Sequence, residues 1–332
     1  MKFSANPRVL GIGNALVDIM TQLNEDTLIE ELGLLKGSMT LVDTEQSKKI
    51  QESTKNLKKE LAAGGSSANT MNGLANLGAE VGFVGVIGRD ELGNFFKKDL
   101  ENNKVIPHLK VTNTDSGRAV ALISPDSERT FATYLGAAIE FTSEDMHPEL
   151  FNGYSLVHVE GYLVQNHELI EAALKMAHDI GLKVAIDLAS FNVVEANLPF
   201  LEKLIRNYVD IVFANEQEAK AFTGLEPEEA LEELAMMCKI AVVKVGPKGA
   251  LIRHGSEVVK IHAIDAVRRD TTGAGDLFAS GFLFGLINGF SLEKCGQIGS
   301  VLAGNVIEVI GAKMDKERWE KIIARVNDIL KT

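Results

Sequence analysis

From residue 154 onward the chain alternates short apolar segments with stretches of helical pattern. The apolar segments are residues 155–159, 183–187, 211–214 and 240–245, and each is followed by enough chain for a helix. This alternation is typical of parallel strands that form one sheet with helices on both of its faces. The sequence therefore predicts an α/β fold with three layers, α/β/α, around a central and mostly parallel sheet.

The first part of the chain predicts the rest of this sheet and a second, smaller one. A glycine-rich turn within residues 63–79 leads into a helix. Residues 110–135 instead alternate apolar and polar side chains, as half-exposed antiparallel strands do. We therefore expect one domain over residues 1–332, which carries a small antiparallel β lid built from two excursions, around 14–45 and 108–138.

Charge and composition exclude some classes of function. The formal net charge is −12, and a chain this acidic lacks the basic surface that general nucleic-acid binding needs. No run of about 18 apolar residues occurs, so we expect no membrane partner. The two cysteines, Cys238 and Cys295, fit no metal-binding spacing, and we expect them to be reduced. These features together favour a cytoplasmic protein.

The stretch DTTGAGDLFASGF, residues 270–282, predicts an anion site at a helix start. Gly273, Ala274 and Gly275 leave the backbone N–H groups of the first turn accessible, where the helix dipole also favours negative charge. Asp276 then stands beside the anion, which is a poor choice for passive binding. It suits a phosphotransferase, because its carboxylate can accept the proton of an attacking hydroxyl. The alternative is an ordinary helix start in which Asp276 favours the dipole.

Two other nucleotide-binding motifs are missing from the sequence. No G-x-x-x-x-G-K-[ST] occurs, so the chain has no Walker loop. The early GIGNAL, residues 11–16, lacks the third glycine of a dinucleotide-binding turn. A nicotinamide dehydrogenase is therefore disfavoured.

Four segments resemble the PfkB, or ribokinase-like, family of sugar and nucleoside kinases. DTTGAGDLFASGF resembles the C-terminal signature of the family, and AGGSSANTMNGLANLG, residues 63–78, resembles the N-terminal one. NEQE, residues 215–218, is similar to its N-x-x-E magnesium motif, and VVKVGPKGALI, residues 242–252, to the strand and turn beside ATP. All four occur in the family's order. GNALVDI, ERTFATYLGAAIEF and EGYLV further resemble the adenosine kinases within the family.

The resemblance implies roles around the transferred phosphoryl group. Asp276 is the expected general base for the substrate's hydroxymethyl oxygen. The N–H groups of Gly273, Ala274 and Gly275 are expected to form the anion hole. Arg129 resembles a lid arginine that approaches the phosphates when the lid closes. Taken alone, Arg129 would be interpreted as a surface turn residue.

The resemblance also implies a substrate site. Asp18 is expected to bind two ribose hydroxyls, which a carboxylate can accept together, and its alternative is a turn residue after a strand. The residues expected to assist it are Asn14, Gly64, Gly65 and Asn69. Tyr162 matches a base-stacking aromatic residue. An apolar slot for the base is expected from Met39, Leu41, Phe131 and Tyr134, although apolar strand residues are usually core.

ATP and Mg²⁺ are the implied cofactors. Asn215 and Glu218 are expected at the metal, and their alternative is a solvated helix start with an asparagine cap. Asp270 is a candidate ligand of a monovalent cation such as K⁺, although the lead-in VRRD departs from the family's pattern. The residues expected to bind ATP are Asn215, Lys244, Gly246, Gly249, Thr271 and Asn305.

The sequence therefore predicts an ATP-dependent kinase that phosphorylates the 5′ hydroxyl of a nucleoside, with adenosine converted to AMP. The first alternative is a sugar kinase of the fructokinase or ribokinase type. The second is a non-catalytic nucleoside-binding protein, which should have lost the base and the metal residues. The lid strands could pair between chains or cover the site of one chain, so both a monomer and a homodimer stay open.

Overall fold

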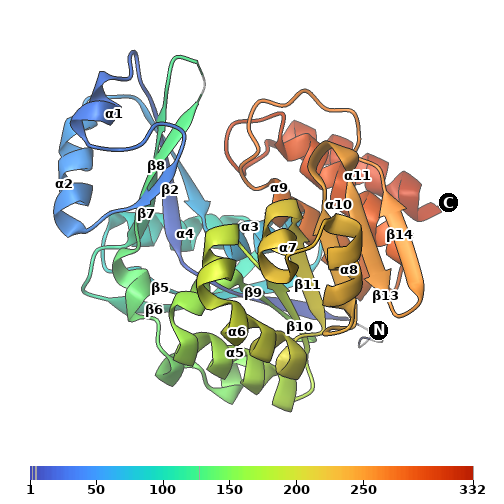
Figure 1. Ribbon diagram of the computed structural model, residues 1–332. Helices are drawn as coiled ribbons and strands as arrows, with labels where there is room; N and C mark the ends of the chain where they lie inside the picture. Colours follow the sequence, from blue (N-terminus) through green and yellow to red (C-terminus); the bar gives the residue numbers. More distant parts are fainter. Residues whose placement is uncertain (2, 4–5, 127, 332) are drawn as a thin grey trace.

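A nine-stranded sheet forms the centre of the molecule (Figure 1). The computed structural model describes residues 1–332 except 2, 4–5, 127 and 332. The strands of the large sheet are β1 (Arg8–Ile12), β5 (Glu80–Gly88), β6 (Val105–Thr112), β9 (Leu156–Glu160), β10 (Lys183–Asp187), β11 (Ile211–Asn215), β12 (Ile240–Lys244), β13 (Ala250–His254) and β14 (Glu257–Ile261).

The strand order confirms a mostly parallel sheet. It runs β14-β13-β12-β11-β10-β9-β1-β5-β6, and every neighbouring pair from β12 to β6 is parallel. The antiparallel hairpin β13–β14 extends one edge. The sequence did not predict this hairpin. The turn that leads from β12 into this hairpin depends on Gly249, whose φ is +100° and where a Cβ would lie 1.9 Å from the Ile261 carbonyl oxygen.

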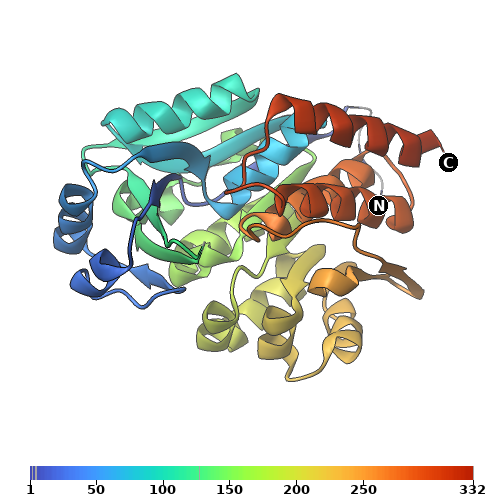
Figure 2. The ribbon, with the colours of Figure 1, turned by 90° about the horizontal axis from the view of Figure 1, so that it is seen from above.

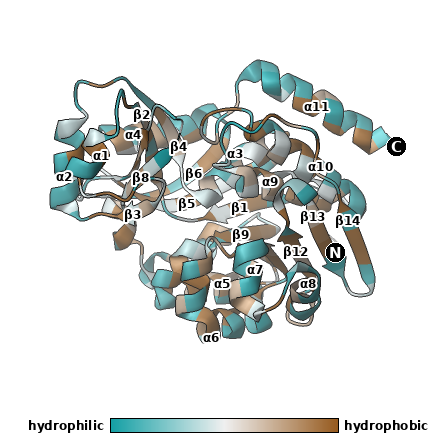
Figure 3. Cartoon of the chain, turned by 45° about the horizontal axis from the view of Figure 1, so that its top comes forward, coloured by the Kyte–Doolittle hydropathy of each residue, from teal (hydrophilic) through white to brown (hydrophobic). Residues whose placement is uncertain are grey.

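Alternate strand residues pack against helices on opposite faces, which gives the three layers. In β1, Val9 packs on one side with α3 and α9, whereas Leu10 and Ile12 pack on the other side with α5 and α6. The strands are largely brown or pale in Figure 3, and teal gathers on outward helix faces such as α11. One layer holds α3 (Ser66–Asn76), α4 (Glu91–Asn102), α9 (Ala274–Ile287), α10 (Leu292–Val306) and, outside α10, α11 (Lys316–Lys331); the other holds α5 (His167–Asp179), α6 (Phe191–Tyr208), α7 (Glu216–Thr223) and α8 (Pro227–Ala235).

The smaller sheet, here called the lid, has five strands and lies at one end of the molecule (Figure 2). Its order is β3-β8-β7-β2-β4, with antiparallel pairs β2–β4 and β7–β8 and parallel pairs β2–β7 and β3–β8. The lid is therefore mixed rather than purely antiparallel. Its strands are β2 (Leu16–Gln22), β3 (Met39–Leu41), β4 (Lys59–Gly64), β7 (Gly117–Ile123) and β8 (Arg129–Tyr134).

The two lid excursions have other bounds than 14–45 and 108–138. The first continues to Gly64, because β4 pairs with β2. The second begins at Gly117, because β6 pairs with β5 in the large sheet along eight residues. β6 is an edge strand and is half-exposed, so its polar alternation resembled that of a lid strand.

Short helices of the lid cover its outer face. α1 (Thr27–Glu31) and α2 (Thr44–Ser53) bury Ile29 and Ile50 against the apolar residues of β2 and β7. The buried Arg118 Nε donates to Ser47 Oγ at 2.9 Å. The opposite face of the lid is turned toward the body. The 3₁₀ helices are η1 (Gly136–Glu140), η2 (Ser143–Asp145), η3 (Pro148–Phe151), η4 (Gly161–Gln165) and η5 (Gly246–Lys248).

Across the described part of the chain, none of the helices combines the length and apolar character needed to cross a membrane.

Candidate active site

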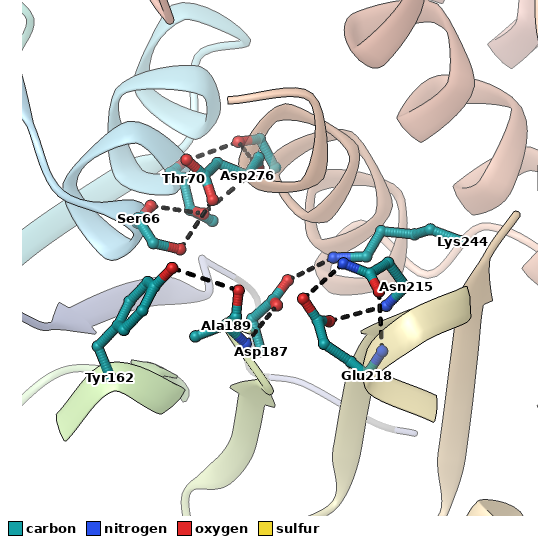
Figure 4. A network of polar contacts seen from close by, with 10 residues as sticks. Ser66, Thr70, Tyr162, Asp187, Ala189, Asn215, Glu218, Lys244 and Asp276 are labelled. Carbon is teal, nitrogen blue, oxygen red and sulfur yellow. Dashed lines mark hydrogen bonds and ion pairs between the residues drawn. The ribbon is translucent and has the colours of Figure 1, made fainter. Parts of the chain in front are cut away.

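Polar residues end four adjacent parallel strands of the large sheet. Glu160 ends β9, Asp187 ends β10, Asn215 ends β11 and Lys244 ends β12. The register pairs Asp187 with Glu160 and Asn215 with Lys244. Ligands of parallel α/β sheets bind at this carboxyl edge. The strand ends therefore define one polar site, which faces the first turns of α3 and α9 (Figure 4).

Asp276 lies in the first turn of α9, and residues of α3 hold both of its carboxylate oxygens. Ser66 Oγ donates to Oδ1 at 2.7 Å, and Asn69 Nδ2 donates to Oδ2 at 3.0 Å. Burial raises the pKa of Asp276 to about 6, although these two hydrogen bonds oppose the rise. The carboxylate is thus oriented and mostly ionised at neutral pH. α3 and α9, which are about 200 residues apart in sequence, meet at this contact.

The start of α9 is open to an anion. Gly273 is its N-cap with φ +76° and no side-chain cap, and a Cβ there would meet the Ala312 Cβ at 2.6 Å. A Cβ on Gly275 would lie 3.0 Å from Lys244 Nζ, so this ammonium stands directly beside the first turn. The N–H of Ala274 already donates to the Thr271 carbonyl at 3.1 Å. Of the three expected anion-hole groups, that of Ala274 is therefore engaged within the loop.

Lys244 stands among carboxylates. Its Nζ lies 2.7 Å from Asp187 Oδ2, and the two side chains are 14% and 7% exposed. Burial alone would lower the pKa of Lys244, but Asp187, Glu218 and Asp276 raise it overall. The lysine therefore stays charged beside the start of α9.

Asn215 and Glu218 form a capping box at the start of α7. Asn215 Oδ1 accepts from the N–H of Glu218 at 2.9 Å, and the carboxylate of Glu218 accepts from Asn215 N and Nδ2 at 2.8 and 2.6 Å. The asparagine-cap alternative thus describes their geometry here. Burial and the nearby Asp187 raise the pKa of Glu218 to about 7.

This donor set fits a hydrated Mg²⁺. Asp187 and Glu218 offer hard carboxylate oxygens, and their crowding around one ammonium leaves an excess of negative charge. Within the described ranges, no group of three or more His, Cys, Asp or Glu is arranged to hold a metal ion. Mg²⁺ commonly binds through one or two carboxylates, with waters and phosphates completing its shell.

Glu160 joins three segments around the expected substrate residue Asn14. Its Oε1 accepts from Asn14 N and Nδ2 at 2.9 and 2.6 Å, and its Oε2 accepts from Ser67 N at 3.1 Å. Only 1% of Glu160 is exposed, and burial raises its pKa to about 7. Glu160 therefore fixes the turn after β1 against the start of α3.

The glycines Gly64 and Gly65 permit close approach at the same place. A Cβ on Gly64 would lie 2.4 Å from the Asp18 carboxylate. Gly65 has φ +90°, and its Cβ would lie 2.3 Å from the Asn14 carbonyl oxygen. Burial raises the pKa of Asp18 to about 7. The structure thus brings the predicted residues Asn14, Asp18, Gly64 and Gly65 together.

The inner face of the lid and the segment before α11 enclose a small hollow beside Asp18. Phe131 is the one predicted slot residue among those that line it. Met39 and Leu41 do not line the hollow: they lie half-exposed on the edge strand β3, where Met39 is paired with Phe131. The residues that line the hollow are Asp18, Met20, Ala62, Ala121, Arg129, Phe131, Thr272, Ile310, Gly311, Ala312 and Lys313.

Two aromatic residues of the predicted slot lie elsewhere. Tyr134 is an odd number of positions from Phe131 on β8 and therefore points to the opposite face of the lid. Its ring lies under the Arg118 guanidinium, 4.7 Å from ring centroid to Cζ, so its inclusion in the slot was wrong. Tyr162 is on η4, where its hydroxyl donates to the Ala189 carbonyl at 3.5 Å beside Asp187 (Figure 4). It is not among the residues that line the hollow.

The residues expected at ATP do not all converge. Gly246, with φ +53°, follows Lys244 in the next turn, and Thr271 is exposed on the loop before α9. Gly249 is required by the β13 turn described above. Asn305 lines a separate polar hollow between α10 and α11, and its Nδ2 donates to the Val301 carbonyl at 2.9 Å. The remaining residues of that hollow are Glu308, Asp315, Glu317, Arg318 and Lys321.

The Asp270 carboxylate does not lie at the same site as Asn215 and Glu218. Its carboxylate pairs with Arg129 of the lid, with the two side chains 6% and 10% exposed. The structure therefore separates the candidate monovalent-cation ligand from the candidate magnesium residues.

Comparison with known proteins identifies the family. A model of the pfkB family carbohydrate kinases matches residues 28–318. The chain belongs to this family. This PfkB-family protein is similar to the solved structures of a probable sugar kinase from Rhizobium etli CFN 42 (34% identity, TM-score 0.88, covering 98% of this chain and 100% of that one) and of adenosine kinase from Sinorhizobium meliloti (35%, 0.86, 97% and 99%).

The kinase is also 26% identical over 340 residues to adenosine kinase from Schizophyllum commune, across 94% of this chain and 97% of that protein. These similarities cover the lid, the large sheet and both signatures. The protein is an ATP-dependent nucleoside or carbohydrate kinase with the ribokinase-like fold.

Three residues of the site were not predicted: Ser66, Glu160 and Asp187. Glu160 and Asp187 carried a usable signal, because each ends an apolar strand that is followed by a helix. Ser66 lies inside the N-terminal signature, but its contact with Asp276 spans 210 residues of sequence.

Proposed function

We propose that this kinase phosphorylates the 5′ hydroxyl of a nucleoside, and that adenosine is its substrate. The observation that carries the proposal is the group of apolar side chains around the small hollow beside Asp18, which must widen to admit a base. Met20, Ala62, Ala121 and Phe131 offer apolar contact to a base, while Asp18 offers acceptors to a ribose diol. The likeness to adenosine kinases over nearly the whole chain supports the same substrate.

Asn69 supports a sugar ring at the same place. Its Nδ2 donates to Asp276, while its Oδ1 is buried and accepts no hydrogen bond within the described structure. A buried acceptor of this kind is costly unless a ligand supplies a donor. A ribose hydroxyl would satisfy it and would bring the sugar next to the base Asp276.

In the proposed reaction Asp276 accepts the proton of the 5′ hydroxyl. The oxygen forms a bond to the γ-phosphorus of ATP while the bond from that phosphorus to the ADP oxygen breaks, and the products are AMP and ADP. Ser66 and Asn69 keep both oxygens of Asp276 in place, one contact each. A positioned base of this type contributes about 10²–10⁴ in rate.

Lys244 and the first turn of α9 stabilise the transferring charge. The ammonium of Lys244, which lies beside Gly275, would act together with the backbone N–H groups of Gly273 and Gly275 on the phosphoryl oxygens. Asp187, Asn215 and Glu218 would hold a hydrated Mg²⁺. When bound, this ion neutralises charge on the β- and γ-phosphates. Closure of the lid excludes water from the reacting groups.

A free sugar is the second candidate substrate, supported by the likeness to a probable sugar kinase and by the polar residues Asn14, Asp18 and Asn69.

We place the activity in the cytoplasm. The two cysteines, Cys238 and Cys295, are free thiols, as is usual in cytoplasmic proteins, and this supports the location.

Calorimetric titration with 5′-deoxyadenosine, adenosine and ribose tests the assignment. 5′-Deoxyadenosine keeps the base and the diol but lacks the attacked hydroxyl, so it should bind within a few-fold of adenosine and inhibit turnover competitively. Ribose should bind far more weakly, because it cannot fill the apolar hollow. Tight ribose binding with no binding of 5′-deoxyadenosine would contradict the nucleoside assignment.

A further inference from the structure

The carboxylate of Asp270 has no vacancy for a cation. Its Oδ1 accepts from Thr272 N at 3.1 Å and from Thr272 Oγ1 at 2.8 Å. Its Oδ2 accepts from Gly311 N at 2.6 Å and from Arg129 Nη1 at 2.5 Å. A carboxylate offers about four lone-pair sites, and four donors occupy them here. Asp270 therefore does not fit the role of monovalent-cation ligand that the sequence suggested.

The positive charge that pairs with Asp270 is the guanidinium of Arg129, a residue of the lid. Arg129 is the first residue of β8, and its Nη1 also lies 3.3 Å from Thr272 Oγ1. The ion pair is almost fully buried, so its attraction is weakly screened. The guanidinium therefore places a positive charge of the lid on Asp270.

The same contact reaches the start of α9. Asp270 shapes the loop 270–273 through its two hydrogen bonds from Thr272, and this loop ends at the N-cap Gly273. Backbone N–H groups of Arg269 and Asp270 hold the loop on the Ile307 carbonyl at 2.8 and 3.1 Å. Arg129 also lines the hollow beside Asp18. One side chain thus contacts the substrate hollow and the loop that leads into the anion site.

We propose that Arg129 is a built-in replacement for a bound monovalent cation at Asp270, so that closing the lid, rather than K⁺, completes the anion-hole loop. Asp270 is then a positioning residue that acts through Arg129 and Thr272. The kinetic consequence rests on the kinase activity proposed above, whereas the structural consequence does not.

Thermal unfolding of the full chain tests the structural part without a substrate. The unfolding midpoint Tm should be the same in KCl and in tetramethylammonium chloride at equal ionic strength. Arg129→Met and Asp270→Asn should each lower Tm by several degrees, because each leaves a buried group without its partner. The double variant should lose no more than the worse single variant. Asp126→Asn, which removes an exposed lid carboxylate paired with Lys36, is the matched control and should change Tm little.

A saturable, K⁺-specific rise in Tm of the unaltered chain would overturn the proposal, and so would additive losses in the double variant. The first comparison needs no variant, so it stands even if a substitution prevents folding. Turnover of the acceptor that the kinase uses should likewise be equal in the two salts. K⁺ activation would contradict the replacement, while absence of turnover with every acceptor would count against the proposed function alone.

Discussion

Among individual residues, Asp276 bears most of the proposed chemistry. Asp276→Asn preserves size but removes the proton acceptor, so kcat should fall by roughly 10²–10⁴ while the dissociation constant for the nucleoside changes only a few-fold. Steady-state kinetics and calorimetry measure the two quantities. Asp179→Asn, an exposed carboxylate paired with Lys175 on α5, is the control and should retain full activity. Unchanged turnover in Asp276→Asn would remove Asp276 from the mechanism.

The sequence pattern indicated Asp276 and the glycines beside it, and the family resemblance indicated Asn14, Asp18 and Asn69. Ser66, Glu160 and Asp187 were missed. The glycines at the start of α9 and Asp276 lie within one short segment, and elementary helix electrostatics indicates their use. Glu160 touches Asn14 across 146 residues, and this contact exists because β9 lies beside β1 in the sheet. No spacing within one segment encodes such a neighbour.

At the level of elements, the start of α9 must remain free of side chains. Gly275→Ala adds a Cβ about 3.0 Å from Lys244 Nζ, which Asp187 holds in place. Alanine favours a helix over glycine, so stability should not fall. Displacement of the ammonium should nevertheless lower kcat by at least about tenfold. Kinetics together with Tm separates the two effects, and wild-type kcat would show that Lys244 does not assist transfer.

The sequence pattern predicted whether most long segments are helices or strands. It did not predict which strands lie at the edges of the sheets or which strands pair. The apolar strands β9 to β12 were expected because each is short and buried. A helix follows β9, β10 and β11 as the pattern indicated, whereas the hairpin β13–β14 follows β12. β6 was assigned to the lid because an edge strand of a parallel sheet is also half-exposed. The pairing of β4 with β2 depends on a return of the chain after α2, which no local period indicates.

For the whole molecule, the buried carboxylates make stability depend on pH. Burial raises the pKa of Asp18, Glu160 and Glu218 to about 7 in the folded protein. An unfolded chain has already released these protons near pH 4, so the folded state holds more protons up to and somewhat beyond pH 7. Folding stability should therefore fall as pH rises through this window, by about 2 kcal/mol for the three groups between pH 6.5 and 8.

Differential scanning calorimetry at pH 6.5 and pH 8 checks this expectation. The buried His158, whose pKa burial lowers to about 4, gives the opposite slope below about pH 7, and within the window it offsets only about 0.4 kcal/mol. Glu160→Gln should reduce the slope, because one of the three titrating carboxylates is then absent. A Tm that rises from pH 6.5 to pH 8 would contradict the assignment of these carboxylates as buried, partly protonated groups.

The central claim concerns the whole molecule as a nucleoside kinase, and one assay tests it most directly. ATP consumption with Mg²⁺ is measured against adenosine, guanosine, inosine, cytidine, ribose and fructose. We predict turnover with adenosine well above that with ribose or fructose, because only a nucleoside offers both a base to the apolar residues of the hollow and a diol to Asp18. Turnover with a free sugar alone would preserve Asp276 and the anion site but contradict the nucleoside account.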